Sequence, residues 1–303
     1  MSKKIYDDHL LYLIAKPLIK RSTSYSYRKV EVRGLENIPT DGSVIITPNH
    51  CNTLMDALVI LRSKKQDSVF GARADIFKRR LIARIMFIGK IIPMVRQRDG
   101  LRNVLKNNDT QEIIVEALEH GLPFCLYPEG KHRPAHSLQP LGKGVCRVAL
   151  AANTKFGDSK PVYIVPAGIE YGDYFRYRST SLVTYGKPIN VTEFIKNLNV
   201  ENEAQIMDPL RKEVAARMSE LITYLKDDEH LNDKWTLTKM LAIDGKKKGY
   251  GDFGTCLYDF MMENRKVAAS VDQALEQEPE RMKELLDDVA KFDKARRKKG
   301  VSI

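Results

Sequence analysis

The sequence predicts an α/β domain in which a central, largely parallel or mixed sheet is flanked by helices, followed by a helical C-terminal extension. Between residues 28 and 190, short runs rich in β-branched residues alternate with longer segments of helical composition, which is the pattern of layered α/β folds. After about residue 190 the chain becomes highly charged and mostly helical in composition. Apolar residues make up 43% of the 303 residues, which is enough for a substantial core.

Each predicted strand is a short β-branched or apolar run bounded by turn-forming residues. Helices are predicted where longer stretches have helical composition. The predicted strands span residues 27–33, 43–47, 68–72, 91–96, 123–127 and 161–169, and the predicted helices span residues 5–21, 53–62, 75–88, 109–120, 144–152 and 281–299.

Residues 5–21 are predicted to form a short apolar helix flanked by cations. Two interpretations stay open: a helix packed on the core, or an interfacial anchor whose Lys16, Lys20 and Arg21 face anionic headgroups. No stretch approaches the roughly 20 apolar residues that a membrane-spanning helix needs. We therefore expect an amphipathic or interfacial helix within residues 1–27, a main domain over 28–190 and a helical extension over 191–303.

The charge balance favours a polyanionic partner, because 50 Lys and Arg face 39 Asp and Glu, a net charge of +11. Nucleic acid is disfavoured, since the cations between residues 78 and 102 lack interleaved aromatic residues apart from Phe87. The four cysteines show neither CxxC spacing nor a disulfide pattern, which indicates a reduced setting. These features predict a location on the cytoplasmic side of a membrane, attached peripherally or monotopically to its anionic surface.

His50 follows a predicted strand, and Asp56 lies six positions later. On one straight helix the two side chains would point about 120° apart, because each residue turns roughly 100°. They meet only if His50 lies in the loop and the helix begins just after it, with Asn52 or Thr53 as N-cap. A neutral imidazole held by a carboxylate is suited to take a proton from an alcohol. His50 is therefore a candidate general base, and Asp56 its orienting carboxylate.

Two further segments are candidates for binding an anion. Arg96 ends the extended run that contains Pro93, and arginine suits bidentate phosphate contact. Glu129 and Gly130 follow another buried strand, and Lys131, His132 and Arg133 come directly after them. Because sites in parallel sheets gather at the carboxyl ends of strands, we expect these segments to lie near His50.

Two other chemistries are disfavoured. His132 and His136 have the i, i+4 spacing of metal ligands, but Pro134 between them argues against a helix, so no metal site is predicted. Cys51 beside His50 is interpreted as a small loop filler rather than a nucleophile, since adjacent residues seldom orient a base toward each other.

Four segments in order, residues 49–56, 92–96, 127–130 and 164–168, resemble the ordered blocks of the glycerolipid acyltransferase family, which comprises 1-acylglycerol-3-phosphate and glycerol-3-phosphate O-acyltransferases. Residues 30–39 also resemble the usual lead-in to the first block, and the resemblance covers roughly residues 28–190. It implies that His50 is the base and Asp56 its partner, and that Arg96, Glu129 and Gly130 bind the glycerophosphate acceptor. It also implies an acyl-CoA or acyl-carrier-protein donor and no cofactor or metal.

The chain departs from the family pattern in two places. Five residues separate His50 from Asp56, where four are usual, and this spacing is similar to that of a subset including fungal-type glycerol-3-phosphate and dihydroxyacetone-phosphate acyltransferases. The third block, which usually continues Thr-Arg-Ser, reads Lys131-His132-Arg133 and keeps a cationic cradle.

The function expected from the resemblance is transfer of a fatty acyl group from a thioester to the hydroxyl of 1-acylglycerol-3-phosphate, in phospholipid biosynthesis. Glycerol-3-phosphate or another lysolipid or hydroxylipid is the alternative acceptor. A non-catalytic, membrane-surface lipid-binding protein is the alternative of another class, against which the presence of both His50 and Asp56 argues.

Overall fold

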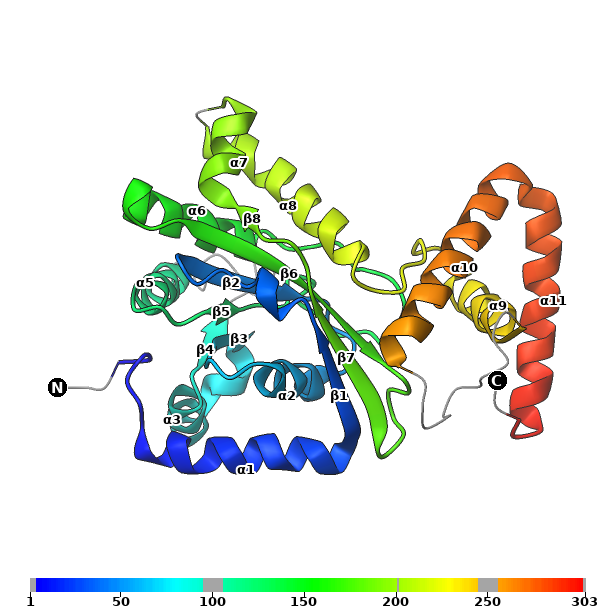
Figure 1. Ribbon diagram of the computed structural model, residues 1–303, viewed down its shortest axis with the longest axis horizontal. Helices are drawn as coiled ribbons and strands as arrows, with labels where there is room; N and C mark the ends of the chain where they lie inside the picture. Colours follow the sequence, from blue (N-terminus) through cyan, green and yellow to red (C-terminus); the bar gives the residue numbers. More distant parts are fainter. Residues whose placement is uncertain (1–3, 95–105, 201, 245–255, 302–303) are drawn as a thin grey trace.

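The computed structural model describes residues 4–94, 106–200, 202–244 and 256–301 (Figure 1). Within them an eight-stranded mixed sheet has the strand order β1-β7-β6-β2-β5-β3-β4, and β8 pairs with the first part of β6. The strands are β1 (Tyr27–Arg33), β2 (Ser43–Pro48), β3 (Val69–Arg73), β4 (Ile91–Met94), β5 (Phe124–Cys125), β6 (Val162–Tyr171), β7 (Ser179–Tyr185) and β8 (Ile189–Asn190).

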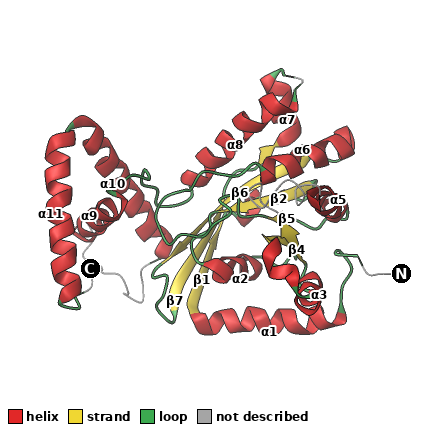
Figure 2. Ribbon diagram, turned by 180° about the vertical axis from the view of Figure 1, so that it is seen from behind, coloured by secondary structure: helices red, strands yellow, loops and turns green. Residues whose placement is uncertain are grey.

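Helices cover both faces of this sheet and extend beyond one of its edges (Figures 1 and 2). They are α1 (Leu10–Ser26), α2 (Thr53–Ser63), α3 (Arg80–Ile88), α5 (Lys106–Glu119), α6 (Gly144–Phe156), α7 (Val191–Leu198), α8 (Glu203–Ser219), α9 (Leu231–Asp244), α10 (Leu257–Gln277) and α11 (Pro279–Lys298).

The parallel part of the sheet positions the site. Strands β6, β2, β5, β3 and β4 run parallel to one another. In register, Ile45 and Ile46 of β2 pair with Phe124 and Cys125 of β5. The loops that leave the carboxyl ends of β2 and β5 therefore start side by side at one edge of the sheet.

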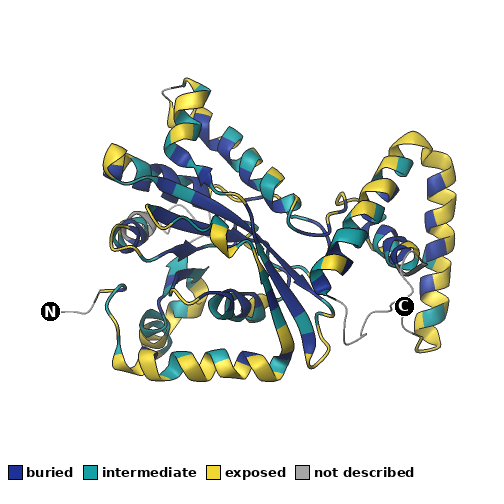
Figure 3. Cartoon of the chain, in the orientation of Figure 1, coloured by how far each residue is buried: buried dark blue, intermediate teal, exposed yellow. Residues whose placement is uncertain are grey.

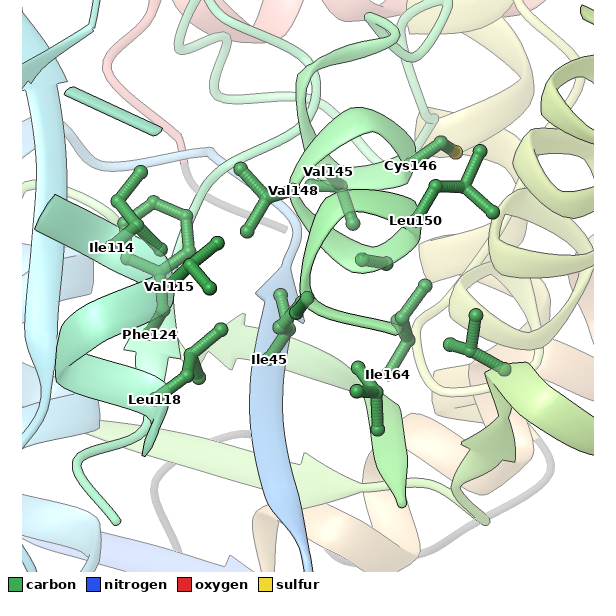
Figure 4. Packing of buried hydrophobic residues seen from close by; sticks show 14 of the residues in the cluster. Ile45, Ile114, Val115, Leu118, Phe124, Val145, Cys146, Val148, Leu150 and Ile164 are labelled. Carbon is green, nitrogen blue, oxygen red and sulfur yellow. The ribbon is translucent and has the colours of Figure 1, made fainter. Parts of the chain in front are cut away.

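Alternate side chains of the central strands enter two separate cores. Ile45 and Ile164 pack with α5 and α6 on one face (Figure 4), whereas Ile46 and Val165 pack with α2 on the other. Because strand side chains alternate between faces, a strand covered on both sides reads as a continuous apolar run. This explains why residues 43–48 are all buried (Figure 3).

The C-terminal helices divide by packing. Buried residues of α7 and α8 belong to the same core as α5 and α6, whereas α9, α10 and α11 share a small cluster that includes Leu237, Val271 and Leu286. The three-helix group is attached to β1 through Glu31, whose carboxylate accepts hydrogen bonds from the backbone amides of Leu257 and Tyr258. Glu31 thereby supplies acceptors that the first turn of α10 lacks.

The structure differs from the predicted elements in three main respects. The N-terminal helix spans α1, Leu10–Ser26, rather than residues 5–21. The helix predicted over 75–88 is split, because Arg79 is extended between a short 3₁₀ turn and α3. Strand β7 was not predicted. It pairs antiparallel with β6 and parallel with β1. The sheet is therefore mixed, which is one of the two forms that the sequence predicted.

Candidate active site

The candidate site lies where the chain leaves β2 and β5. His50 stands in the loop after β2, and Asp56 is in the first turn of α2. Nδ1 of His50 and Oδ2 of Asp56 are 2.7 Å apart. The loop-then-helix arrangement predicted for this pair is therefore the observed one, and it brings together two side chains that a continuous helix would separate.

Asp56 is completely buried and fully hydrogen-bonded. Oδ2 accepts from the backbone amides of Cys51 at 2.9 Å and Asn52 at 2.8 Å, besides its contact with His50. Oδ1 accepts from the hydroxyl of Tyr171 at 2.7 Å. Donors of this kind stabilise the ionised carboxylate. An ionised Asp56 in turn requires the proton of a neutral imidazole to be on Nδ1, which leaves Nε2 as the basic nitrogen.

Asn52 stands at the N-cap position of α2, as one of the two predicted candidates, but its side chain does not cap the helix. The side chain of Asn52 makes no capping bond, and its amide instead donates to the backbone carbonyl of Tyr174 at 3.0 Å. Asp56 serves the amides ahead of the helix, and Thr53 adopts a left-handed φ of 47°. The loop is therefore closed by the same carboxylate that contacts the ring of His50.

The imidazole of His50 is held on a ring platform and retains limited access to solvent. It stacks on Tyr127, with ring centroids 4.4 Å apart, and meets the ring of His132 edge-on at 5.8 Å. The side chain of His50 is 18% exposed. The ring of this candidate base is therefore fixed in orientation and partly exposed, as a general base requires.

Both carboxylate oxygens of Glu129 accept hydrogen bonds from backbone amides. Its Oε1 accepts from the amide of His50 at 2.7 Å, and its Oε2 accepts from the amide of Gln139 at 2.9 Å. Burial raises the pKa of this carboxyl. The expectation was a contact with the acceptor, but both oxygens are occupied by the loops around His50. Glu129 therefore links the loop that carries His50 to the loop that carries Gln139.

The remaining residues of this loop have separate environments. Gly130 has φ +65°, a conformation that suits glycine. Lys131 and His132 are exposed. Arg133 forms a two-bonded ion pair with Asp227, at 3.0 and 2.8 Å, and its backbone amide donates to the carbonyl of His50. Of the three predicted cations, Lys131 and His132 remain open to a ligand, while Arg133 ties the loop to the segment after α8.

The predicted anion ligand Arg96 lies outside the described residues. Strand β4, which precedes it, ends at Met94 and runs parallel to β3. The carboxyl end of β4 therefore faces the same edge as the ends of β2 and β5.

Two contacts at the candidate site were missed from the sequence. The buried side chain of Asn49 exchanges hydrogen bonds with the backbone of Ile169 on β6, at 2.6 and 3.1 Å, and Tyr171 at the end of the same strand contacts Asp56. Gly168 precedes them, and any side chain there would collide with the backbone of Leu221. The position of Asn49 beside His50 was a usable signal, whereas nothing near Tyr171 in the sequence points to Asp56.

Cys51 lies beside His50 but is 3% exposed, and burial raises the pKa of its thiol well above the ordinary value. The thiolate is the reactive form. The interpretation of Cys51 as a loop filler is therefore consistent with its environment.

His50 thus lies at the carboxyl end of a parallel strand, with its ring held by the buried carboxylate of Asp56. A family model described as "Acyltransferase" matches residues 29–170. Over residues 29–170, a little under half of its length, the chain is thus similar to acyltransferases.

Individual proteins similar to this chain include a yeast enzyme and a bacterial enzyme of known structure. Glycerol-3-phosphate O-acyltransferase 1 of Saccharomyces cerevisiae is 27% identical over 129 residues, which is 42% of this chain and 17% of the yeast protein. The crystal structure of the 1-acyl-sn-glycerophosphate acyltransferase PlsC from Thermotoga maritima matches with 21% identity and a TM-score of 0.47, and the match covers 69% of this chain and 77% of that one.

Proposed function

We propose that this protein is an O-acyltransferase that moves a fatty acyl group from a thioester donor to the hydroxyl of 1-acylglycerol-3-phosphate. The observation that carries the proposal is the 2.7 Å contact between His50 Nδ1 and the buried carboxylate of Asp56. A structural histidine does not need a buried, fully hydrogen-bonded carboxylate beside a partly exposed ring. This arrangement also argues against a non-catalytic lipid-binding protein.

In the proposed reaction, Nε2 of His50 takes the proton from the acceptor hydroxyl as the oxygen attacks the thioester carbonyl. The resulting imidazolium is stabilised by Asp56. When the C–S bond breaks, the imidazolium returns its proton to the leaving thiolate, and an ester and a free thiol result. General base catalysis of this kind contributes about 10²–10⁴-fold in rate.

The acceptor phosphate is proposed to bind Arg96 and the exposed Lys131 and His132. The ring of His132 contacts His50, so a phosphate bound there would lie close to the base. Glycerol-3-phosphate is a second candidate acceptor. The family similarity to a glycerol-3-phosphate O-acyltransferase favours it, as does the five-residue spacing between His50 and Asp56.

We further propose that the protein attaches peripherally or monotopically to the cytoplasmic side of an anionic membrane, through α1 and α3. The outer face of α1 exposes Leu10, Leu11, Ile14 and Leu18, and α3 exposes Leu81 and Ile85. His9, just before α1, meets Phe87 of α3 with ring centroids 6.4 Å apart, so the two helices adjoin at that end. Amphipathic helices of this type bind the headgroup region.

Cations accompany this apolar surface. Lys78, Arg79, Arg80 and Arg84 are exposed on or before α3. Of the cations predicted for the N-terminal helix, Lys16 is paired with Asp67 and Lys20 donates to the carbonyl of Lys64, while Arg21 is exposed. Within the described residues, no helix is long and apolar enough to cross a membrane.

The central test replaces the base. His50→Ala should lower turnover by at least about 10²-fold while the thermal unfolding midpoint stays near the wild-type value. The matched control is His120→Ala, an exposed histidine that directly follows α5 and stacks on Tyr6. Purified protein is assayed with acyl-CoA and acyl-carrier protein, each crossed with glycerol-3-phosphate and its 1-acyl derivative, so that donor and acceptor are identified together. Wild-type turnover in His50→Ala would refute the proposal.

A further inference from the structure

A cavity of about 320 Å³ lies between the acyltransferase domain and the three C-terminal helices. One wall comes from the loop after β5 and the segment after β6, and includes His136, Tyr174 and Phe175. The opposite wall comes from α9 and α11, and includes Trp235, Lys239 and Arg297. The size is within the range of small-molecule sites.

The cavity and the His50 site are bordered by the same two segments, the loop after β5 and the segment after β6. The loop whose His132 contacts the ring of His50 continues to His136, which packs on Trp235 with ring centroids 3.6 Å apart. On the other side, the backbone carbonyl of Tyr174 accepts a hydrogen bond from the side chain of Asn52, next to the base. A ligand in the cavity would therefore contact the same two segments that frame His50.

The charge of the cavity is one-sided. Its lining residues include Lys239 and Arg297 and, among those the structure describes, no carboxylate. The ammonium of Lys239 lies 5.7 Å from the centre of the Trp235 ring, and no described carboxylate forms an ion pair with it. Burial lowers the pKa of Lys239. The charges of Asp293 and Asp173 partly oppose this shift. A partly desolvated cation that no described carboxylate pairs with directly gains from an anionic ligand.

An ion pair with Asp293 holds the guanidinium of Arg297 at the wall of the cavity. Its Nε is paired with Asp293 at 2.6 Å. A guanidinium held through Nε still has its terminal N–H groups, which suit a phosphate. The aromatic side chains of Tyr174, Phe175 and Trp235 provide apolar surface for the rest of the ligand.

We propose that this cavity is a second ligand site, which binds a phosphate-bearing molecule through Lys239 and Arg297 beside the His50 site. Two sources share this chemistry: the phosphate of a glycerophosphate acceptor and the phosphates of a nucleotide that carries the thioester. The assignment of a source rests on the proposed acyltransferase function, whereas the phosphate site itself does not.

Trp235 is the single tryptophan of the chain, so its fluorescence reports on this cavity alone. The protein is titrated with inorganic phosphate, glycerol-3-phosphate and coenzyme A at about 0.1 M salt, and calorimetry gives the same affinities independently. Lys239→Gln should weaken binding by about tenfold or more, and Arg297→Gln should weaken it in the same direction. The control Lys291→Gln removes a cation exposed on α11 and should leave the affinity unchanged.

The three probes distinguish the sources. Saturation by coenzyme A alone assigns the site to the donor, and saturation by glycerol-3-phosphate but not coenzyme A assigns it to the acceptor. Saturation by all three shows recognition of phosphate itself. The proposal is overturned if no probe gives saturable binding, or if both Lys239→Gln and Arg297→Gln bind like the wild type. His50→Ala should retain binding, so a failed phosphate site and a failed catalytic proposal give different results.

Discussion

The hydroxyl of Tyr171 donates a 2.7 Å hydrogen bond to Oδ1 of Asp56, across 115 positions of the sequence. It ties the end of β6 to the carboxylate that orients His50. Tyr171 therefore acts as a positioning residue for the proposed base.

Tyr171→Phe removes this hydroxyl and leaves Oδ1 of a buried carboxylate short of one donor. We expect kcat to fall about tenfold or more with little change in KM, and the free energy of unfolding to fall by about 1–3 kcal/mol. Tyr163→Phe is the matched control, because it removes a hydroxyl from the same strand that is bonded to Asp41 at the surface. An unchanged kcat in Tyr171→Phe would show that the contact is only structural.

Asp56→Asn tests the carboxylate itself. An amide cannot accept from Cys51, Asn52 and Tyr171 at once while also receiving the Nδ1 proton of His50. We expect kcat to fall by about 10²-fold or more, with a loss of about 1–3 kcal/mol in the free energy of unfolding. Steady-state kinetics and urea unfolding measure the two effects. Activity close to wild type would remove Asp56 from the mechanism.

Glu129 predicts a pH dependence of stability. Burial raises its pKa above the ordinary 4.5, so the folded state binds more protons at this site than the unfolded state between 4.5 and the raised value. The stabilisation from protonated Glu129 is fully present below pH 4.5 and is lost as the pH rises through the folded pKa.

Glu129→Gln removes this titration. The difference in unfolding free energy between wild type and variant should change across that pH window and be constant above it. At neutral pH the variant should be less stable by about 1–3 kcal/mol, because one of the two amides bonded by Glu129 loses its acceptor. Urea unfolding of both proteins at a series of pH values provides the curve. A difference in unfolding free energy that does not change with pH would show that Glu129 does not contribute to the pH dependence of stability.

Lys131 and Arg133 lie two positions apart, but we expect only Lys131 to contribute to binding of the phosphorylated acceptor. Lys131 is exposed and open to a phosphate, whereas Arg133 is already paired with Asp227. Lys131→Gln should raise KM for the phosphorylated acceptor by about tenfold, and Arg133→Gln should leave that KM within about twofold. Acceptor titrations at saturating donor compare them. The reverse ranking would contradict the proposed acceptor contacts.

Membrane binding is tested on α3. Leu81 and Ile85 are 70% and 57% exposed, so replacing both by Asp should leave the fold intact. Vesicle binding should weaken by about tenfold or more, because each buried aliphatic side chain contributes about 1.5–3 kcal/mol. Leu285→Asp on α11 is the control, with 43% exposure. Co-sedimentation with vesicles containing anionic lipid measures the binding, and equal binding of all three proteins would exclude α3.

Sequence reasoning was sufficient for the features that depend on local pattern. The strands at residues 43–48 and 162–171, the loop position of His50 and the helix that carries Asp56 follow from apolar runs, turn residues and a six-residue spacing. Each depends on neighbours within a few positions, which is the range over which backbone preferences act. The order of the four blocks then predicted the family.

The tertiary structure alone decided how these parts meet. Strand β7 was missed because its pairing partners lie in β1 and β6, and pairing with the sheet rather than periodicity makes it a strand. Tyr171 reaches Asp56 across 115 positions, and Glu129 reaches the amide of His50 across 79. The residues next to a carboxylate or hydroxyl in the sequence do not reveal its hydrogen-bond partner. Only the fold determines which donor and which acceptor meet. Spacing thus predicted the His50–Asp56 pair, and long-range contacts determined what holds it in place.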